Sequence, residues 1–196
     1  DILEIGYTST LASGKDSNVA AINSSGRLCL INNCKFQCYE DSKENFLSCT
    51  FDDSGILYCG TRRNHIYKYE IKNNQFNRIG AIETGNLSCI NGLYNNHGKI
   101  FICADNGIGY ITKSGTAKQI NTESFNNSID TMLSDYQGNY WFTSSRLGLL
   151  KMSNSSFINL YNQLGMDQKV VNSIALWDDS IYVGTDAGLD VIKDGK

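Results

Sequence analysis

The sequence contains no proline and only two histidines among its 196 residues. Proline would remove a backbone N–H from a sheet, so its absence leaves every strand able to pair fully. His65 and His97 are expected at opposite ends of their sheets and cannot share a metal ion. No Gly-x-Ser-x-Gly elbow and no phosphate-binding loop is present. We therefore expect no catalytic residue, no metal and no cofactor in this segment.

Long apolar runs and an excess of one charge are also missing. No segment approaches the roughly 20 apolar residues that cross a bilayer, and 17 basic residues stand against 20 acidic ones. The isolated pair Arg62 and Arg63 does not form the basic face that nucleic acid requires. The chain begins at Asp1 without a methionine, so we expect part of a larger protein whose membrane segments lie elsewhere.

The seven cysteines have none of the Cys-x2-Cys spacing that is typical of zinc sites. They are Cys29, Cys34, Cys38, Cys49, Cys59, Cys89 and Cys103. Most lie between apolar or small residues, which favours thiols that act as small buried side chains. Cys34 and Cys38 lie in one predicted strand and cannot bridge each other while that strand stays extended. The pattern therefore favours a reduced or anaerobic setting.

A unit of about 40 residues recurs along the chain. Its apolar centres start at Val19, Leu57, Ile100, Tyr140 and Ile181, which places successive copies 38 to 43 residues apart. A short apolar strand and a turn rich in Asp, Asn or Gly precede each centre, and a polar turn and a half-polar strand follow it. Four antiparallel strands with their turns have the size of one β-propeller blade.

The sequence therefore predicts an all-β protein, a β-propeller with about five four-stranded blades that form part of a ring. The blades are expected near residues 1–41, 42–84, 85–123, 124–165 and 166–196, the last without its outer strand. No apolar stripe with helical spacing persists, and only residues 162–168 are expected to form a helical turn. Because open blade edges remain at both ends, we expect this fragment either to pair with another copy or to be a remnant of proteolysis.

Two copies of the unit carry a specific pattern. Residues 128–144 read Ser-Ile-Asp-Thr-Met-Leu-Ser-Asp-Tyr-Gln-Gly-Asn-Tyr-Trp-Phe-Thr-Ser, and residues 172–189 read Asn-Ser-Ile-Ala-Leu-Trp-Asp-Asp-Ser-Ile-Tyr-Val-Gly-Thr-Asp-Ala-Gly-Leu. Both resemble the two-component regulator propeller repeat, with Tyr182 where that family usually has tryptophan. The resemblance implies a sensing propeller, typically of seven blades, on the extracytoplasmic side of a cell-membrane protein. It also implies a connection through a membrane helix to a histidine kinase or a diguanylate cyclase.

The recurring residues of this pattern are expected to serve the fold, because a binding site needs only one copy of each residue. They are Gly60, Thr61, Trp141, Tyr182, Gly184, Thr185 and Gly188. We expect the glycines to allow close packing or turns with positive φ. We expect Trp141 and Tyr182 to wedge between blades. Asp135 and Asp178 are expected to cap hairpin turns.

Propellers usually bind ligands at the face where the loops between second and third strands gather. The candidate ligand-binding residues are the polar residues of these loops: Arg62, Arg63, Asn64, Asp105, Asn106, Arg146 and Asp186. Arg and Asp side chains fork onto carboxylates and sugar hydroxyls, so we expect a small ligand, for which carbohydrate is one candidate. The alternative for each residue is an ordinary solvated loop.

These observations together predict a ligand- or partner-binding sensor domain of a bacterial membrane-bound signalling protein, and not an enzyme. The protein would act in a two-component or cyclic-di-GMP system. Two alternatives stay open. A propeller-fold enzyme of the lyase or lactonase type would need histidines or carboxylates that converge on the central channel. A passive protein-docking scaffold would need no small ligand at all.

Overall fold

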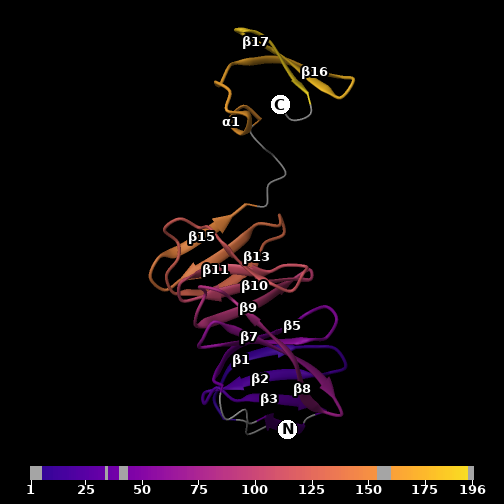
Figure 1. Cartoon of the computed structure of the whole chain (residues 1–196), viewed down its shortest axis with the longest axis vertical. Coiled ribbons are helices and arrows are strands. Elements are labelled where there is room, and N and C mark those ends of the chain that lie inside the picture. The colour runs from indigo at the N-terminus through magenta and orange to yellow at the C-terminus, as the bar shows by residue number, and fades with distance from the viewer. Residues whose placement is uncertain (1–5, 34, 40–43, 154–159, 194–196) are drawn as a thin grey trace. The chain divides into compact units, whose positions relative to one another are not determined.

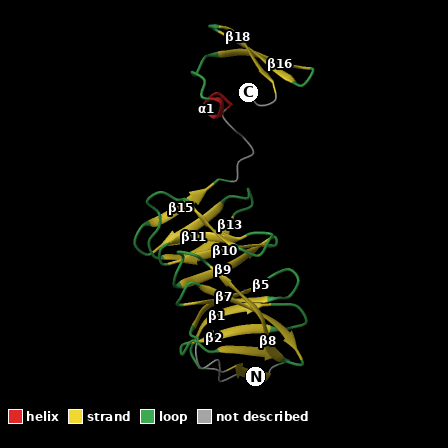
Figure 2. Ribbon diagram, in the orientation of Figure 1, coloured by secondary structure: helices red, strands yellow, loops and turns green. Residues whose placement is uncertain are grey.

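The structure is a computed structural model, and it describes residues 6–33, 35–39, 44–153 and 160–193. The chain divides into two compact units, Asp1–Asn154 and Ser155–Lys196, which are described separately. The described residues contain 18 strands in five antiparallel sheets and one short helix. The prediction of an all-β protein built from successive antiparallel sheets is confirmed (Figure 2).

Unit 1 holds four sheets, in each of which the strands pair in the order of the sequence. The first contains β1 (Thr8–Ser13), β2 (Val19–Asn23), β3 (Leu28–Asn32) and β4 (Lys35–Tyr39). The second contains β5 (Phe46–Phe51), β6 (Leu57–Thr61), β7 (His65–Lys72) and β8 (Gln75–Glu83). The third contains β9 (Ile90–Asn96), β10 (Lys99–Ala104), β11 (Gly107–Ile111) and β12 (Ala117–Ile120). The fourth contains β13 (Ile129–Ser134), β14 (Tyr140–Ser144) and β15 (Gly148–Met152).

Unit 2 contains α1 (Leu160–Leu164) and a sheet of β16 (Val171–Trp177), β17 (Ser180–Thr185) and β18 (Gly188–Lys193). The fourth copy of the sequence unit predicts a half-polar outer strand for the preceding sheet at residues 156–161. Residues 156–159 lie outside the described residues, and the prediction was wrong for Leu160 and Tyr161, which are helical. The helical turn expected at residues 162–168 starts earlier, at Leu160, and ends at Leu164.

Short turns explain why each sheet folds on itself. Asn73 and Asn74, with φ of 52° and 58°, join β7 to β8. Asp178 and Asp179, with φ of 45° and 58°, join β16 to β17 in the same way. Two consecutive residues with positive φ give the turn whose twist matches an antiparallel hairpin, and Asn and Asp tolerate this backbone better than other non-glycine residues.

The sheets of unit 1 follow one another face to face (Figure 1). An apolar layer fills each interface. The layer between the first two sheets includes Leu28 and Tyr69, and the next layer includes Ile66 and Ile102. Phe101 and Phe142 pack between the third and fourth sheets. The first strands β1, β5, β9 and β13 contact one another in sequence. In unit 1, the first strand of each sheet therefore lies next to the first strand of the following sheet.

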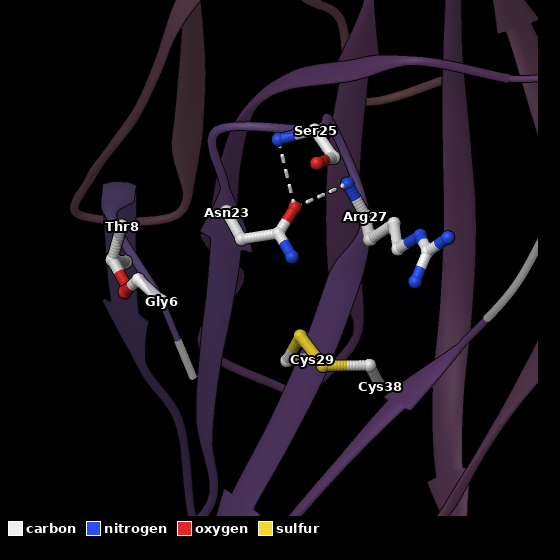
Figure 3. Close-up of a disulfide and its surroundings, with 7 residues drawn as sticks. All are labelled: Gly6, Thr8, Asn23, Ser25, Arg27, Cys29 and Cys38. Carbon is white, nitrogen blue, oxygen red and sulfur yellow. Dashed lines mark hydrogen bonds between the residues drawn. A yellow bond between two sulfur atoms is a disulfide. The ribbon is translucent and has the colours of Figure 1, made fainter. Parts of the chain in front are cut away.

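The structure also corrects the prediction for the cysteines. Cys29 and Cys38 form a disulfide between β3 and β4, where their backbones are directly opposite (Figure 3). Cys49, Cys59 and Cys103 are free and buried, as small apolar side chains would be. Cys34 lies outside the described residues. The prediction was wrong for the pair because it tested bridges within one strand and did not consider a partner on the neighbouring strand.

Candidate functional site

One extra residue interrupts the first strand of every sheet. The register shifts in β1, β5, β9, β13 and β16 each skip a single residue of that strand. The skipped residues are Ser9, Leu47, Asn91, Asp130 and Asn172. A β-bulge of this kind bends the strand and re-aims a side chain away from the regular ladder. The fold therefore repeats the same irregularity in the first strand of each sheet, in both units.

The bulges of unit 1 lie near the loops that join second to third strands, because those loops are fastened to the start of the next sheet. The amide of Phe46 donates to the carbonyl of Gly26 at 3.0 Å, and the amide of Cys89 donates to the carbonyl of Arg62 at 3.1 Å. The amide of Ser128 donates to the carbonyl of Asp105 at 2.7 Å. The predicted loops and the bulges thus meet at one end of the sheets.

Side chains at the bulges link each first strand to the next one. In each case a polar side chain at or just after the bulge donates to a main-chain carbonyl of the neighbouring sheet. The bonds run from Thr10 to Leu47 O at 3.1 Å, from Ser48 to Ile90 O at 2.7 Å and from Asn91 to Ile129 O at 3.3 Å. These bonds tie the first strands of neighbouring sheets to one another.

Two hollows meet at this end of unit 1. The first, named here the mouth cleft, has a volume of about 460 Å³ and is lined by Tyr7, Ser9, residues 23–26, residues 45–47, Arg62 and Asn91. The second, the inner groove, has a volume of about 720 Å³ and runs along the first strands. It is lined by residues 9–13, 48–51, 91–95 and 130–131. Ser9 and Asn91 line both, so the mouth cleft opens into the inner groove at two of the bulges.

Of the seven candidate binding residues, Arg62 lines the mouth cleft directly. Asp105 does not line the cleft, but its carboxylate accepts a hydrogen bond of 2.7 Å from the side-chain amide of Asn91, which does. The structure therefore brings these two predicted residues to one site through a third residue. Arg62 is exposed, and Asn91 is half-buried.

The other candidates lie elsewhere or serve the fold. The amide side chain of Asn106 bonds to the main chain of Asn86 and Ser88, and that of Asn64 donates to the carbonyl of Gly85 at 3.4 Å. Arg63 and Arg146 are exposed and do not line the mouth cleft or the inner groove. Asp186 belongs to unit 2, where its amide donates to the carbonyl of Val170.

Burial, and then nearby charged side chains, shift the pKa values of three groups at or near the site. The pKa of the Cys89 thiol is raised, mainly by burial and then by Asp105, while the positive charge of Arg62 acts against that rise. Burial raises the pKa of Cys103 in β10 to about 12, and the Asp130 carboxylate adds to the effect. Burial also raises the pKa of the Tyr94 phenol. Both groups are therefore neutral near neutral pH; Tyr94 lines the inner groove, whereas Cys103 is fully buried.

Sequence reasoning missed the bulge residues, chiefly Ser9, Asn91 and Asp130. A signal existed, since each follows the residue that opens a first strand and recurs at the repeat interval. An alignment on the second and third strands of each copy does not display this position. In addition, the extra residue becomes visible only once the register with the second strand is known.

The recurring motif residues have identifiable contacts. The hydroxyls of Thr61 and Thr185 accept hydrogen bonds from the amides of Arg63 and Ala187, and each donates to a main-chain carbonyl across its loop. Gly188 has a φ of 129°, which disfavours any side chain. These contacts hold the loop conformations that follow the second strands.

Trp141 and Tyr182 are both half-buried. The indole of Trp141 donates to the Asp135 carboxylate at 2.9 Å. Asp135 also accepts from the amides of Gln137 and Asn139, which closes its hairpin. Asp178 occupies the corresponding turn of unit 2 through its backbone, with positive φ.

No group of three metal-binding side chains occurs among the residues that the structure describes. His65 opens β7, next to the loop, whereas His97 lies in the turn between β9 and β10 at the other end of its sheet. Within the same described ranges, no helix has the length and hydropathy that crossing a membrane requires.

Successive antiparallel sheets that share a line of first strands define a β-propeller-like architecture, and comparisons with solved structures agree. The chain is similar to the extracellular domain of a predicted hybrid two-component system from B. thetaiotaomicron, with a TM-score of 0.56 and 18% identity over 93% of this chain. It spans 26% of that domain and 28% of a second one from the same organism.

Two other similar structures have different functions. Virginiamycin B lyase from Staphylococcus aureus matches with a TM-score of 0.57 and 12% identity over 95% of this chain and 70% of its own. YCF48 bound to D1 peptide matches with a TM-score of 0.65 and 13% identity over 79% of this chain and 53% of its own. No protein-family model and no curated protein matches the sequence. At these identities the likenesses show the fold alone.

Proposed function

We propose that this chain is part of the ligand-binding region of an extracellular sensor domain in a membrane-bound bacterial signalling protein. The observation that carries the proposal is the mouth cleft, which opens into the inner groove at the bulged residues Ser9 and Asn91. Concave sites with a few convergent polar groups are the usual form of ligand sites. The likeness to extracellular domains of signalling systems supports the sensing role.

The disulfide supports the extracellular location. Disulfides persist in oxidising compartments and are rare in the cytosol of most bacteria. Cys29 is fully buried and Cys38 is half-buried, so the pair is enclosed largely within the first sheet. A permanent bridge in this position fits a domain that works outside the cytoplasm.

A ligand in the cleft would contact more than one sheet at once. Asn91 belongs to the third sheet, residues 45–47 to the start of the second, and residues 23–26 to the first. Binding would therefore favour one arrangement of neighbouring sheets, which is the differential contact that a signalling change needs. The resemblance of the repeats suggests a histidine kinase or a diguanylate cyclase as the output.

The test is a thermal-shift and calorimetric screen of residues 1–196 against oligosaccharides, with a variant that fills the cleft. Ser24 lines the cleft and is exposed, so Ser24→Trp should abolish binding without disturbing the core. Ser114→Trp, in the exposed turn between β11 and β12, is the matched control and should bind normally. A ligand whose binding survives Ser24→Trp would show that the mouth cleft is not its site.

The lyase-like neighbours favour one alternative, a catalytic propeller. Asp130 and Tyr94, which line the inner groove, are two ionisable groups that could take part. Incubation with a streptogramin B antibiotic, followed by mass spectrometry, separates the two functions. A sensor leaves the antibiotic intact, whereas a lyase of that class changes it.

Self-association also stays part of the proposal. In unit 2, the first strand β16 leaves Ile174, Leu176 and Trp177 between 72% and 76% exposed. Apolar surface of this kind commonly marks an interaction site. Light scattering coupled to size-exclusion chromatography should show a dimer. A stable monomer over a wide concentration range would refute self-association.

A further inference from the structure

Among the described residues, the mouth cleft carries a single charged side chain. Arg62 is the one charged residue among those that line it. In the described part of the chain, its guanidinium has no hydrogen bond and no ion pair. A guanidinium presents five donors in a fixed fork that matches an oxyanion. Arg62 is therefore a cation that faces a cleft without an internal counter-ion.

The backbone of Arg62 is nevertheless held firmly. Its carbonyl accepts from the amide of Cys89 at 3.1 Å and from the Cys89 thiol at 3.3 Å. The next residue, Arg63, has its amide capped by the Thr61 hydroxyl at 3.2 Å, and that hydroxyl donates to the carbonyl of His65. The loop thus fixes the origin of the Arg62 side chain, which lowers the entropic cost of ordering it on a ligand.

The nearby carboxylate that could compete for Arg62 is already engaged. Asp105 accepts from the Asn91 side-chain amide at 2.7 Å. The same Asn91 amide donates to the carbonyl of Ile129, at 3.3 Å. Asn91 thus holds Asp105 towards the third sheet while the guanidinium stays available to the cleft.

The rest of the cleft wall adds donors. The side-chain oxygen of Asn23 accepts from the amides of Ser25 and Arg27, at 3.1 and 3.0 Å, so its NH2 group is the part left for a ligand (Figure 3). The hydroxyls of Ser24 and Ser25 have no hydrogen-bond partner within the described ranges, and both residues are exposed. Neutral donors beside one unpaired guanidinium favour a ligand that carries a negative charge.

We propose that the mouth cleft recognises an oxyanion group of its ligand, with Arg62 as the charged partner and Asn23, Ser24 and Ser25 as neutral donors. This inference rests on the proposed function, because it assigns the ligand chemistry of the same cleft. Carboxylates and sulfate or phosphate esters share the required geometry. The uncharged remainder of the ligand would extend past Ser9 and Asn91 into the inner groove.

The test is an NMR titration of residues 1–196, which follows backbone amides, with glucuronate and glucose as probes that differ by one carboxylate. Inorganic sulfate and phosphate form two further arms that distinguish the sources of the oxyanion. Glucuronate should shift the amides of residues 23–26 and Asn91 and bind at least about tenfold more tightly than glucose, the effect expected of a charge-assisted hydrogen bond. Added sodium chloride should weaken the interaction.

The matched variants are Arg62→Gln and Arg63→Gln, which remove the same charge from adjacent exposed positions. The first should weaken glucuronate binding about tenfold or more, and the second should leave it within about twofold. Equal losses in both, or an absence of shifts with every anion at tens of millimolar, would overturn the proposal. If glucose and glucuronate bind the cleft equally well, ligand binding stands and oxyanion recognition fails.

Discussion

Ser48 and Gly60 face each other across β5 and β6, and the serine occupies the space that a side chain at position 60 would need. A Cβ atom on Gly60 would lie 2.6 Å from the Ser48 hydroxyl oxygen and 2.6 Å from a methyl carbon of Ile90. The φ of Gly60 is not in the left-handed region, so the position requires space and not conformational freedom. Gly184 stands in the same relationship to Ser173 in unit 2.

We expect Gly60→Ala to destabilise unit 1 by about 1–3 kcal/mol, the usual cost of overpacking a core position. Neither contact can relax easily, because Ser48 donates to a buried carbonyl and Ile90 is fully buried. Chemical denaturation followed by circular dichroism measures the change. Gly80→Ala is the control, since its Cβ would meet only the flexible Lys68 side chain at 3.3 Å. Comparable losses in both variants would refute the steric account.

The repeat alone predicted this glycine as a structural residue, together with the sheets around it. The prediction succeeds because the turns depend on local chemistry, such as Asn73 and Asn74 or the Asp178–Asp179 pair. The partner of the glycine could not be predicted. The bulge at Leu47 shifts the register so that Ser48 becomes the opposite residue, and a register is a property of two paired strands.

The same limit explains the errors at the site and at the cysteines. Arg62 and Arg63 are adjacent and chemically equal, and only the direction of the loop decides which of them lines the mouth cleft. Asn91 gained its role from a bulge that no composition rule reveals. Cys29 and Cys38 meet because β4 pairs antiparallel with β3 in a register that sets them opposite each other, a pairing that the distance along the chain does not specify.

The second prediction concerns the hydroxyl of Ser48. It donates to the carbonyl of Ile90 at 2.7 Å in a buried environment and links the second sheet to the third. Ser48→Ala would leave that carbonyl without its partner, so we expect a loss of about 1–3 kcal/mol in the free energy of unfolding. The exposed Ser114→Ala should change it by no more than about 0.5 kcal/mol. A neutral Ser48→Ala would mean that water replaces the hydroxyl.

The third prediction concerns pH. Hydrogen bonds from Asn139 and from the indole of Trp141 lower the pKa of Asp135 from 3.8 to about 2. A carboxyl whose pKa is lower in the folded state stabilises the fold above its ordinary pKa, and this contribution is lost as the pH falls through the folded value. Asp135→Asn should therefore be less stable than the natural chain at neutral pH, and the difference should shrink between pH 3.8 and about 2.

A second variant tests the cause of that shift. Trp141→Phe removes the indole donor, so the pKa of Asp135 should rise towards its ordinary value when it is followed by NMR of the carboxyl carbon. The matched control is Trp177→Phe, at an exposed tryptophan of unit 2. If the pKa of Asp135 does not move in Trp141→Phe, the backbone amides of its turn are sufficient to hold it.

The last prediction concerns the disulfide. The bridge between Cys29 and Cys38 closes a loop with a sequence separation of 9. It restricts the conformations of the unfolded chain, and for a loop of this size that restriction stabilises the folded state by about 2–3 kcal/mol. The double variant Cys29→Ala/Cys38→Ala should lose about this much stability in the free energy of unfolding. The double variant Cys49→Ala/Cys59→Ala, at an opposed pair of free thiols in β5 and β6, is the control for cavity formation.

Adding a reducing agent should lower the stability of the natural chain and of this control, and leave the stability of the Cys29→Ala/Cys38→Ala chain unchanged. Mass spectrometry without reduction should find the bridged peptide in protein that was exported to an oxidising compartment, and free thiols there at both positions would contradict the assignment.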